Sequence, residues 1–343
     1  MANAFQLYVT FSGESSKGQP GGANVPVKHV RAYDQAGTAH GRVTPDYDEL
    51  RGMATDPNGR FYLAVAPKSG SGIDVFSATI GTDGYSRALL GTAVTPQTST
   101  ALSHPYELAF NGAVLFASNQ GTNVVAGYVP AVAGFPASPL DVASYLSTTF
   151  PTGGTFYPGT YVASAHPVPV GNETPPPVPV AQGGLTMTGF NPPAATKHSV
   201  RGILFVDGTL YVADEGGARV ALYDAGTGAF SGSLTATSDG KYTFATPVGL
   251  ALDPTTGHVY IGDPGNDAIF SYHPSSKKLD VVVDKKSGGS AVEKVSGLAV
   301  DSDGTLYFAS RKAQAISTYA NGKVTTFVSG LTDTPECLLL VAV

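Results

Sequence analysis

The strongest constraint on the fold of this 343-residue chain is a repeated pattern of two apolar runs around a polar turn. In each copy the turn contains Asp, Asn or Gly, and the second run has an aromatic residue near its centre. Such a pattern predicts a β-hairpin, and its recurrence predicts a repeat architecture. Four copies begin at Arg51, Arg201, Val248 and Ser296, and a fifth with a shorter turn begins at Tyr106.

A third apolar run follows each hairpin and has the form Ile or Val, two residues, then Phe or Tyr. Because the runs are short and bounded by turn residues, they predict a third strand in each repeat. The same form also occurs once near the start of the chain, which makes six copies. They end at Tyr33, Phe76, Tyr128, Tyr223, Tyr272 and Tyr319.

The sixth copy lacks a first strand of its own. It follows "FQLYVTF", which has the form of a second strand, whereas "PECLLLVAV" at the end of the chain aligns with the first strand "PVGLAL". The last residues therefore supply the missing innermost strand. This arrangement predicts an all-β fold, a six-bladed β-propeller closed by pairing of the C-terminal strand with the N-terminal strands. The whole chain, 1–343, is then one domain, with one blade built from residues 1–43 and 331–343.

One segment stands outside the repeats. Residues 131–197 hold 12 of the 25 prolines and carry no repeat signature. Without them the chain has about 46 residues for each of six blades, which fits propeller repeats. The insertion is either a cap folded over one face or a solvated excursion, and its aromatic residues favour the cap.

Composition narrows the class of protein. Only 13% of the residues are charged, the net charge is −6 and Gly and Pro are abundant, which indicates strands and turns and argues against nucleic acid as a partner. No apolar stretch reaches the roughly 20 residues of a membrane span. Cys337 is the single cysteine, so we expect a buried side chain and no intramolecular disulfide.

The expected compartment is extracytoplasmic, either secreted or periplasmic. The start "MANAF" lacks a signal peptide, but low charge and a glycosylation acceptor at Asn172 are typical of exported proteins whose signal peptide has been removed. A cytoplasmic location stays open. We expect a monomer.

The segment "PVGLALDPTTGHVYIGDPGNDAIFSY" resembles an NHL repeat, and through it the chain is similar to SMP-30/gluconolactonase and strictosidine synthase-like propellers. The resemblance covers nearly all of the chain outside 131–197. It implies the architecture more than the activity, because one propeller type serves many functions. It also implies that Asp214 and Asp263 cap turns by accepting backbone N–H groups.

In a propeller the first strands line the central channel, so aligned residues at their beginnings predict an outer ring at one mouth. These residues are Arg51, Tyr106, Arg201, Val248, Ser296 and Glu336. The next positions are Gly52, Glu107, Gly202, Gly249, Gly297 and Cys337, and the four glycines are expected to leave space for a ligand or water. The loops between second and third strands are expected at the same mouth, including a Gly-rich loop at 12–28 that is either a lid or a solvated loop.

The resemblance allows tests for metal chemistry. SMP-30-like proteins hold a divalent cation with a Glu and further Asn and Asp ligands at the mouth, but here only Glu336 matches and two ring positions are Arg. Amidating lyases, another NHL-type group, use a zinc bound by three His, whereas this chain offers His104 and His198 without an evident third. We therefore expect no metal and no cofactor. An enzyme would use Glu336, which resembles the single Glu of strictosidine synthase-like enzymes, with His104 and His198.

A metal-free interpretation fits the ring better. Arg51, Arg201 and Tyr106 favour a carboxylate or phosphate, with Glu107 and Ser296 beside them. Glu336 would then pair with an Arg while the site is empty, or act as a base on a bound substrate. An alternative is a salt-bridge network of Arg51, Glu336 and Arg201 that plugs the channel. Three functions remain open: a module that binds a small anion or a protein partner, a propeller enzyme of the lyase, hydrolase or synthase kind, and a protein-interaction scaffold.

Overall fold

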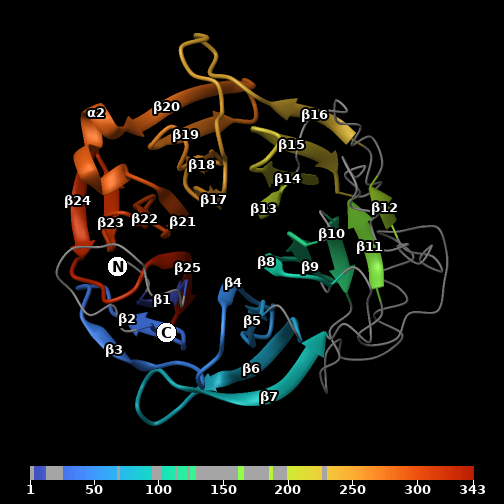
Figure 1. Ribbon diagram of the computed structural model, residues 1–343, viewed down its shortest axis with the longest axis vertical. Coiled ribbons are helices and arrows are strands. Elements are labelled where there is room, and N and C mark those ends of the chain that lie inside the picture. Colours follow the sequence, from blue (N-terminus) through green and yellow to red (C-terminus); the bar gives the residue numbers. More distant parts are fainter. Residues whose placement is uncertain are drawn as a thin grey trace. The chain divides into compact units, whose positions relative to one another are not determined.

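The secondary structure of the computed structural model is almost wholly β, arranged in six sheets (Figure 1). In the described part of the chain the helices are α2 (Lys285–Gly288) and the 3-10 helix η1 (Gly289–Val292). None of the described helices is long and apolar enough to cross a membrane. The described residues are 4–12, 26–67, 70–94, 102–112, 114–121, 124–128, 161–165, 185–187, 199–225 and 230–343.

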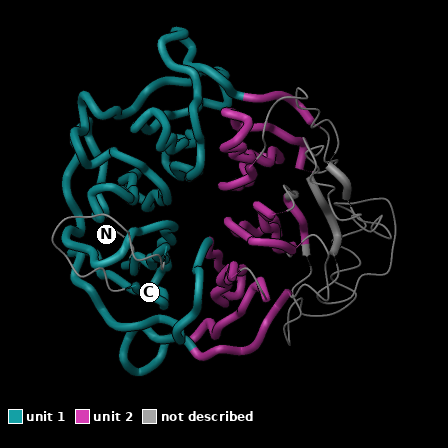
Figure 2. The backbone as a smooth tube through the Cα atoms, in the orientation of Figure 1, with its two compact units in different colours: residues 1–51, 80–87, 234–343 teal, residues 52–79, 88–233 magenta. Residues whose placement is uncertain are grey.

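The chain divides into two compact units (Figure 2). Unit 1 comprises Met1–Arg51, Ile80–Arg87 and Leu234–Val343, and unit 2 comprises Gly52–Thr79 and Ala88–Ser233. Three sheets lie in unit 1, and the sheets that begin at β8 and β13 lie in unit 2 apart from the last residue of β16. The remaining sheet, β4 to β7, has residues in both units.

Each unit 1 sheet has four strands, which follow one another from the innermost outward. The first contains β17 (Gly249–Leu252), β18 (Val259–Asp263), β19 (Ala268–His273) and β20 (Lys278–Asp284). The second contains β21 (Val295–Val300), β22 (Leu306–Ser310), β23 (Ala315–Ala320) and β24 (Lys323–Val328). The third contains β25 (Pro335–Ala342), β1 (Phe5–Phe11), β2 (Arg31–Tyr33) and β3 (Ala39–Arg42).

The other sheets follow the same order. One contains β4 (Leu50–Thr55), β5 (Phe61–Val65), β6 (Gly72–Ile80) and β7 (Arg87–Val94). One contains β13 (Val200–Val206), β14 (Thr209–Asp214), β15 (Arg219–Asp224) and β16 (Phe230–Leu234). The last has five strands, β8 (Pro105–Asn111), β9 (Val114–Asn119), β10 (Val124–Tyr128), β11 (Tyr161–Ala165) and β12 (Leu185–Met187).

The predicted closure is confirmed. The C-terminal strand β25 pairs antiparallel with β1, with Val9 opposite Leu338 and Leu7 opposite Leu340. Just before β25, the Asp333 carboxylate accepts the Val27 N–H at 2.9 Å, and the Thr334 carbonyl accepts the Ser12 N–H at 2.9 Å. The end of the chain is thus the innermost strand of the blade whose other strands lie near the start.

The fourth strand of each sheet was not predicted, because only the first three strands carry strong apolar patterns. In the sheet that begins at β8, the outer strands β11 and β12 come from the 131–197 insertion, and β11 pairs antiparallel with β10. The rest of the insertion and residues 13–25 of the 12–28 loop lie outside the described residues. The expectations of a cap and of a lid therefore stay predictions.

The core consists of side chains packed between sheet faces. One cluster joins Val9 and Leu338 of the closing sheet to Tyr307 and Ile316 of the sheet beside it in unit 1.

Buried carboxylates hold polar turns. Asp263 accepts the N–H groups of Ala245, Thr246 and Gly265, and Asp214 accepts those of Ser199 and Gly217. Both predicted turn caps are confirmed.

Candidate functional site

The glycines beside the ring positions lie against neighbouring backbone. A Cβ on Gly297 would lie 2.6 Å from the Glu336 carbonyl oxygen, and a Cβ on Gly52 would lie 2.5 Å from the Glu107 Cα. Gly249 lies against the Ser296 carbonyl in the same way. The expectation that these glycines leave space for a ligand was therefore wrong for Gly52, Gly249 and Gly297. They allow adjacent innermost strands to approach closely.

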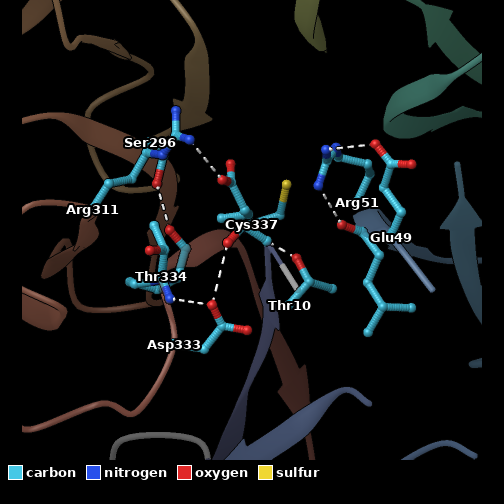
Figure 3. Close-up of polar contacts among 12 residues, drawn as sticks. Thr10, Glu49, Arg51, Ser296, Arg311, Asp333, Thr334 and Cys337 are labelled. Atoms are coloured by element: carbon cyan, nitrogen blue, oxygen red, sulfur yellow. Dashed lines mark hydrogen bonds and ion pairs between the residues drawn. The ribbon is translucent and has the colours of Figure 1, made fainter. Parts of the chain in front are cut away.

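Glu336 lies in unit 1 at the beginning of β25, and its side chain is only 4% exposed. Its carboxylate pairs with Arg311, whose Nη2 lies 3.1 Å from Glu336 Oε1 (Figure 3). Arg311 comes directly after β22 and is 46% exposed. The buried carboxylate is therefore covered by a guanidinium group that faces solvent.

Arg51, also in unit 1, has local partners (Figure 3). Its Nη2 donates to Glu49 Oε1 at 3.1 Å, and its Nη1 donates to the Leu50 carbonyl at 3.0 Å. Its Nε is buried and has no acceptor among the described residues. The Glu49 backbone has a φ of 60°, a conformation that is uncommon outside glycine.

Ser296 and Cys337 face the interior of unit 1. The Ser296 hydroxyl donates to the Pro335 carbonyl at 3.0 Å, and the Cys337 N–H donates to Thr10 Oγ1 at 3.1 Å (Figure 3). Both residues are buried, as the sequence predicted for Cys337. Because the Ser296 hydroxyl already donates inside the protein, it has only acceptor capacity left for a ligand.

In unit 2 the structure brings two ring residues together. The Arg201 guanidinium lies over the Tyr106 ring, 4.6 Å from its centroid, which is cation–π geometry. Arg201 Nε donates to Glu215 Oε2 at 2.8 Å, Nη2 lies 2.6 Å from the same oxygen, and Nη1 donates to Gln120 Oε1 at 2.6 Å. An aromatic ring, a carboxylate and an amide thus hold one cation in place.

Glu107 lies beside this group on β8. Its Oε1 accepts the Leu108 N–H at 3.2 Å, and its carboxylate also accepts the Met53 N–H. Desolvation by burial outweighs these two hydrogen bonds and raises the pKa of Glu107 to about 7. The Glu107 N–H donates to Ser118 Oγ at 3.0 Å, and Ser118 Oγ donates to the Arg201 carbonyl, which links Glu107 to the Arg201 backbone.

Each charged ring residue pairs with a residue of opposite charge in its own unit. The predicted network of Arg51, Glu336 and Arg201 has members in both units, and it stays a prediction. The sequence did not predict these pairings, which are with Glu49, Glu215 and Arg311. A signal existed for all three partners, because Glu49 lies two residues before Arg51, and Glu215 and Arg311 lie in the loops between second and third strands that were expected at this mouth.

Of the two predicted histidines, only His104 lies in the described part of the chain. His104, in unit 2, has a φ of 50°, its N–H donates to Ser71 Oγ at 3.3 Å, and its carbonyl accepts the Gln120 N–H at 3.0 Å. His198 lies outside the described residues, so the catalytic set of Glu336, His104 and His198 stays a prediction. Within the described ranges, no three His, Cys, Asp or Glu residues are grouped to hold a metal ion.

Comparison with known proteins supports the fold. No family model and no curated protein matches the sequence. Among solved structures, a chain of a nidogen–laminin complex is 11% identical with a TM-score of 0.59, and the match covers 98% of both chains. A Lactobacillus plantarum protein is 14% identical with a TM-score of 0.55, and the match covers 96% of this chain and 83% of that one.

A third similar structure is a candidate 6-phosphogluconolactonase from Bacteroides uniformis. It is 13% identical with a TM-score of 0.56, and the match covers 94% of this chain and 82% of that one. At such identities a likeness shows the fold and not the activity. The chain is an all-β, six-bladed β-propeller, as predicted, while the resemblance to NHL repeats stays a prediction.

Proposed function

We propose that this propeller binds a small ligand with a carboxylate or phosphate group, and that Arg201 of unit 2 is the anchor. The observation that carries the proposal is the arrangement of Arg201 over Tyr106. A guanidinium group has five N–H donors, and the contacts to Glu215 and Gln120 engage three of them. Two donors therefore remain without an acceptor among the described residues, on a side chain that is 17% exposed.

Rigid placement favours this role. The Tyr106 ring, Glu215 and Gln120 hold the Arg201 side chain before any ligand arrives. Less rotamer freedom is then lost on binding, and a preorganised donor binds an anion more tightly than a mobile one. Glu215 offsets part of the positive charge, so the ligand must also gain from hydrogen bonds and not from charge alone.

Glu107 supports a ligand that combines an anion with hydroxyl groups. Because its pKa is about 7, its carboxyl group is partly protonated at neutral pH and can donate a hydrogen bond. A carboxylate can accept about four hydrogen bonds, and two are provided by Leu108 and Met53. As far as the described residues go, capacity for a ligand hydroxyl therefore remains.

Binding is tested by calorimetry at pH 7 with citrate, succinate, inorganic phosphate and 6-phosphogluconate. The last probe combines phosphate with hydroxyl groups, and one of the similar structures is a candidate 6-phosphogluconolactonase. We expect at least one probe to bind the wild type. Arg201→Ala should raise Kd about 10- to 100-fold, because the charged hydrogen bonds to the ligand are lost. Arg201→Lys should recover only part of the affinity, because a lysine lacks the guanidinium fork.

The matched control is Arg42→Ala, which removes an exposed Arg that is paired with Asp46 in unit 1. This variant should leave Kd within twofold of the wild type. Equal affinities for the wild type and Arg201→Ala would overturn the proposal, and so would the absence of binding by all four probes at millimolar concentration.

A further inference from the structure

Five cations form a contiguous cluster in unit 1, around α2 and the loop after β22. We call it the basic cluster; its members are Lys285, Lys286, Lys294, Arg311 and Lys312, and all five are exposed. Lys285 and Lys312 both pair with the Glu293 carboxylate, Lys312 at 2.7 Å. The Arg311 N–H donates to the Lys294 carbonyl at 3.1 Å, which joins the two parts of the cluster.

The negative charges beneath the cluster are buried. Glu293 and Glu336 are 9% and 4% exposed, whereas the Lys285, Lys312 and Arg311 side chains above them are 55%, 58% and 46% exposed. Hydrogen bonds from Lys285 and Lys312 lower the pKa of Glu293 to about 2, so both lysines stay held at neutral pH. A partner that approaches this face meets ammonium and guanidinium groups first.

The nearby aspartates point toward other donors. Asp267 accepts the Lys294 N–H at 2.9 Å, and Asp284 accepts the Tyr242 hydroxyl at 2.7 Å and the Ser287 N–H at 2.9 Å. Asp267, Asp284, Glu293 and Glu336 carry four negative charges, and the basic cluster carries five positive charges, so this region has a net charge of +1. The whole chain has a net charge of −6. The exposed layer of this face therefore has the opposite sign to the chain as a whole.

We propose that the basic cluster is a docking surface for a short acidic polypeptide segment. Three of its cations already bind protein carboxylates, so their spacing suits Asp and Glu side chains. A segment of a few residues matches the cluster, whereas a long polyanion would extend over a protein of net negative charge and be repelled.

The test measures binding of a fluorescein-labelled octaglutamate peptide to the full chain by anisotropy at 50 and 300 mM NaCl. We expect saturable binding at 50 mM NaCl that weakens at least fivefold at 300 mM, because surface charges are screened. Charge reversal by Lys286→Glu with Lys294→Glu should weaken binding at least tenfold. Neither side chain pairs with Glu293 or Glu336, so this variant keeps both buried ion pairs.

The control is Lys277→Glu with Lys278→Glu, at two exposed lysines where the β19–β20 hairpin reverses, at the opposite end of that hairpin from Asp284 and α2. It makes the same change in net charge and should weaken binding less than threefold. Circular dichroism and the melting temperature show that each variant is folded. Equal effects of the two double variants would overturn the proposal, as would no peptide binding at 1 mM. Tighter binding of a heparin oligosaccharide or single-stranded DNA than of the peptide would also overturn it. Because Arg201 is not involved, failure here leaves the proposed small-ligand site unaffected.

Discussion

The Glu107 side chain occupies a position that four of the other five repeats give to glycine. It lies where a Gly52 side chain would be, so the innermost strand β4 shields part of the carboxylate from water, and Glu107 is half-buried. Because its pKa in the folded protein is about 7, compared with about 4.3 in an unfolded chain, the folded state binds this proton more tightly. The resulting stability is complete below about pH 4 and is lost as the pH rises to about 7.

Glu107→Gln is therefore expected to change how stability depends on pH. The variant keeps an acceptor for the Leu108 and Met53 N–H groups but does not titrate. Its free energy of unfolding should be close to that of the wild type at pH 4.5 and higher by about 1–3 kcal/mol at pH 8, a range that allows for the partly exposed carboxylate. Urea unfolding at both pH values measures this difference.

The control for this experiment is Asp48→Asn, which removes an exposed carboxylate paired with Lys28. Exposed pairs contribute about 0–1 kcal/mol, so this variant should stay close to the wild type at both pH values. The assignment of a raised pKa would be contradicted if the free energies of unfolding of the wild type and Glu107→Gln differed by the same amount at pH 4.5 and at pH 8.

The strand positions of Arg51, Arg201 and Glu336 could be predicted from the sequence, but their partners could not. Strand alignment determines where the side chains of Arg51, Arg201 and Glu336 begin, because strand position sets the direction of Cβ. The partners of Arg201 and Glu336 are Glu215 and Arg311, which lie in loops whose conformation no repeat pattern specifies. A long arginine side chain can also reach several acceptors in a loop, and the folded structure determines which of them it contacts.

At the scale of elements, contact between innermost strands depends on glycine. The backbone of β25 passes so close to β21 that a Cβ on Gly297 would lie 2.6 Å from the Glu336 carbonyl oxygen and 2.8 Å from the Cys337 Cα. Both atoms belong to backbone and cannot rotate away. Gly297→Ala should therefore lower the free energy of unfolding by about 1–3 kcal/mol, the usual cost of overpacking, in equilibrium urea unfolding.

Gly72→Ala is the matched control, because a Cβ there would lie no closer than 3.6 Å to any atom of the described residues, and the backbone is not in a glycine conformation. Its stability should be within about 0.5 kcal/mol of the wild type, as for substitutions without strain. If both variants were equally stable, the close approach of β21 and β25 would be contradicted.

The inner three strands of each sheet were predictable and the outer strand was not, for a physical reason. Third strands such as β19 are buried along nearly their whole length, so they require an apolar sequence. Outer strands such as β3 and β16 are exposed or half-buried, and their sequences, "AHGR" and "FSGSL", carry little apolar signal. Strand β11 lies far from β10 in sequence, inside a Pro-rich insertion, and is recognised only by its pairing with β10 and β12.

At the scale of the whole molecule, the closing sheet joins the two ends of the chain. Deleting residues 335–343 would remove β25, leave the edge of β1 unpaired and expose its apolar neighbours in the cluster with Tyr307 and Ile316. Leu338 and Val341 are buried, and each buried aliphatic side chain contributes roughly 1.5–3 kcal/mol. Their loss, with the β1–β25 hydrogen bonds, approaches the typical stability of a domain, about 5–15 kcal/mol.

We therefore expect the truncated chain to lose its cooperative unfolding transition and to aggregate through the exposed β1 edge. Differential scanning calorimetry and light scattering measure both effects. Val343→Ser, at a side chain that is 57% exposed, tests whether a change at the terminus alone disturbs the fold, and it should melt like the wild type. A truncated chain with the melting temperature of the wild type would show that β25 is dispensable, and closure would then have to be attributed to contacts between blades rather than to the shared sheet.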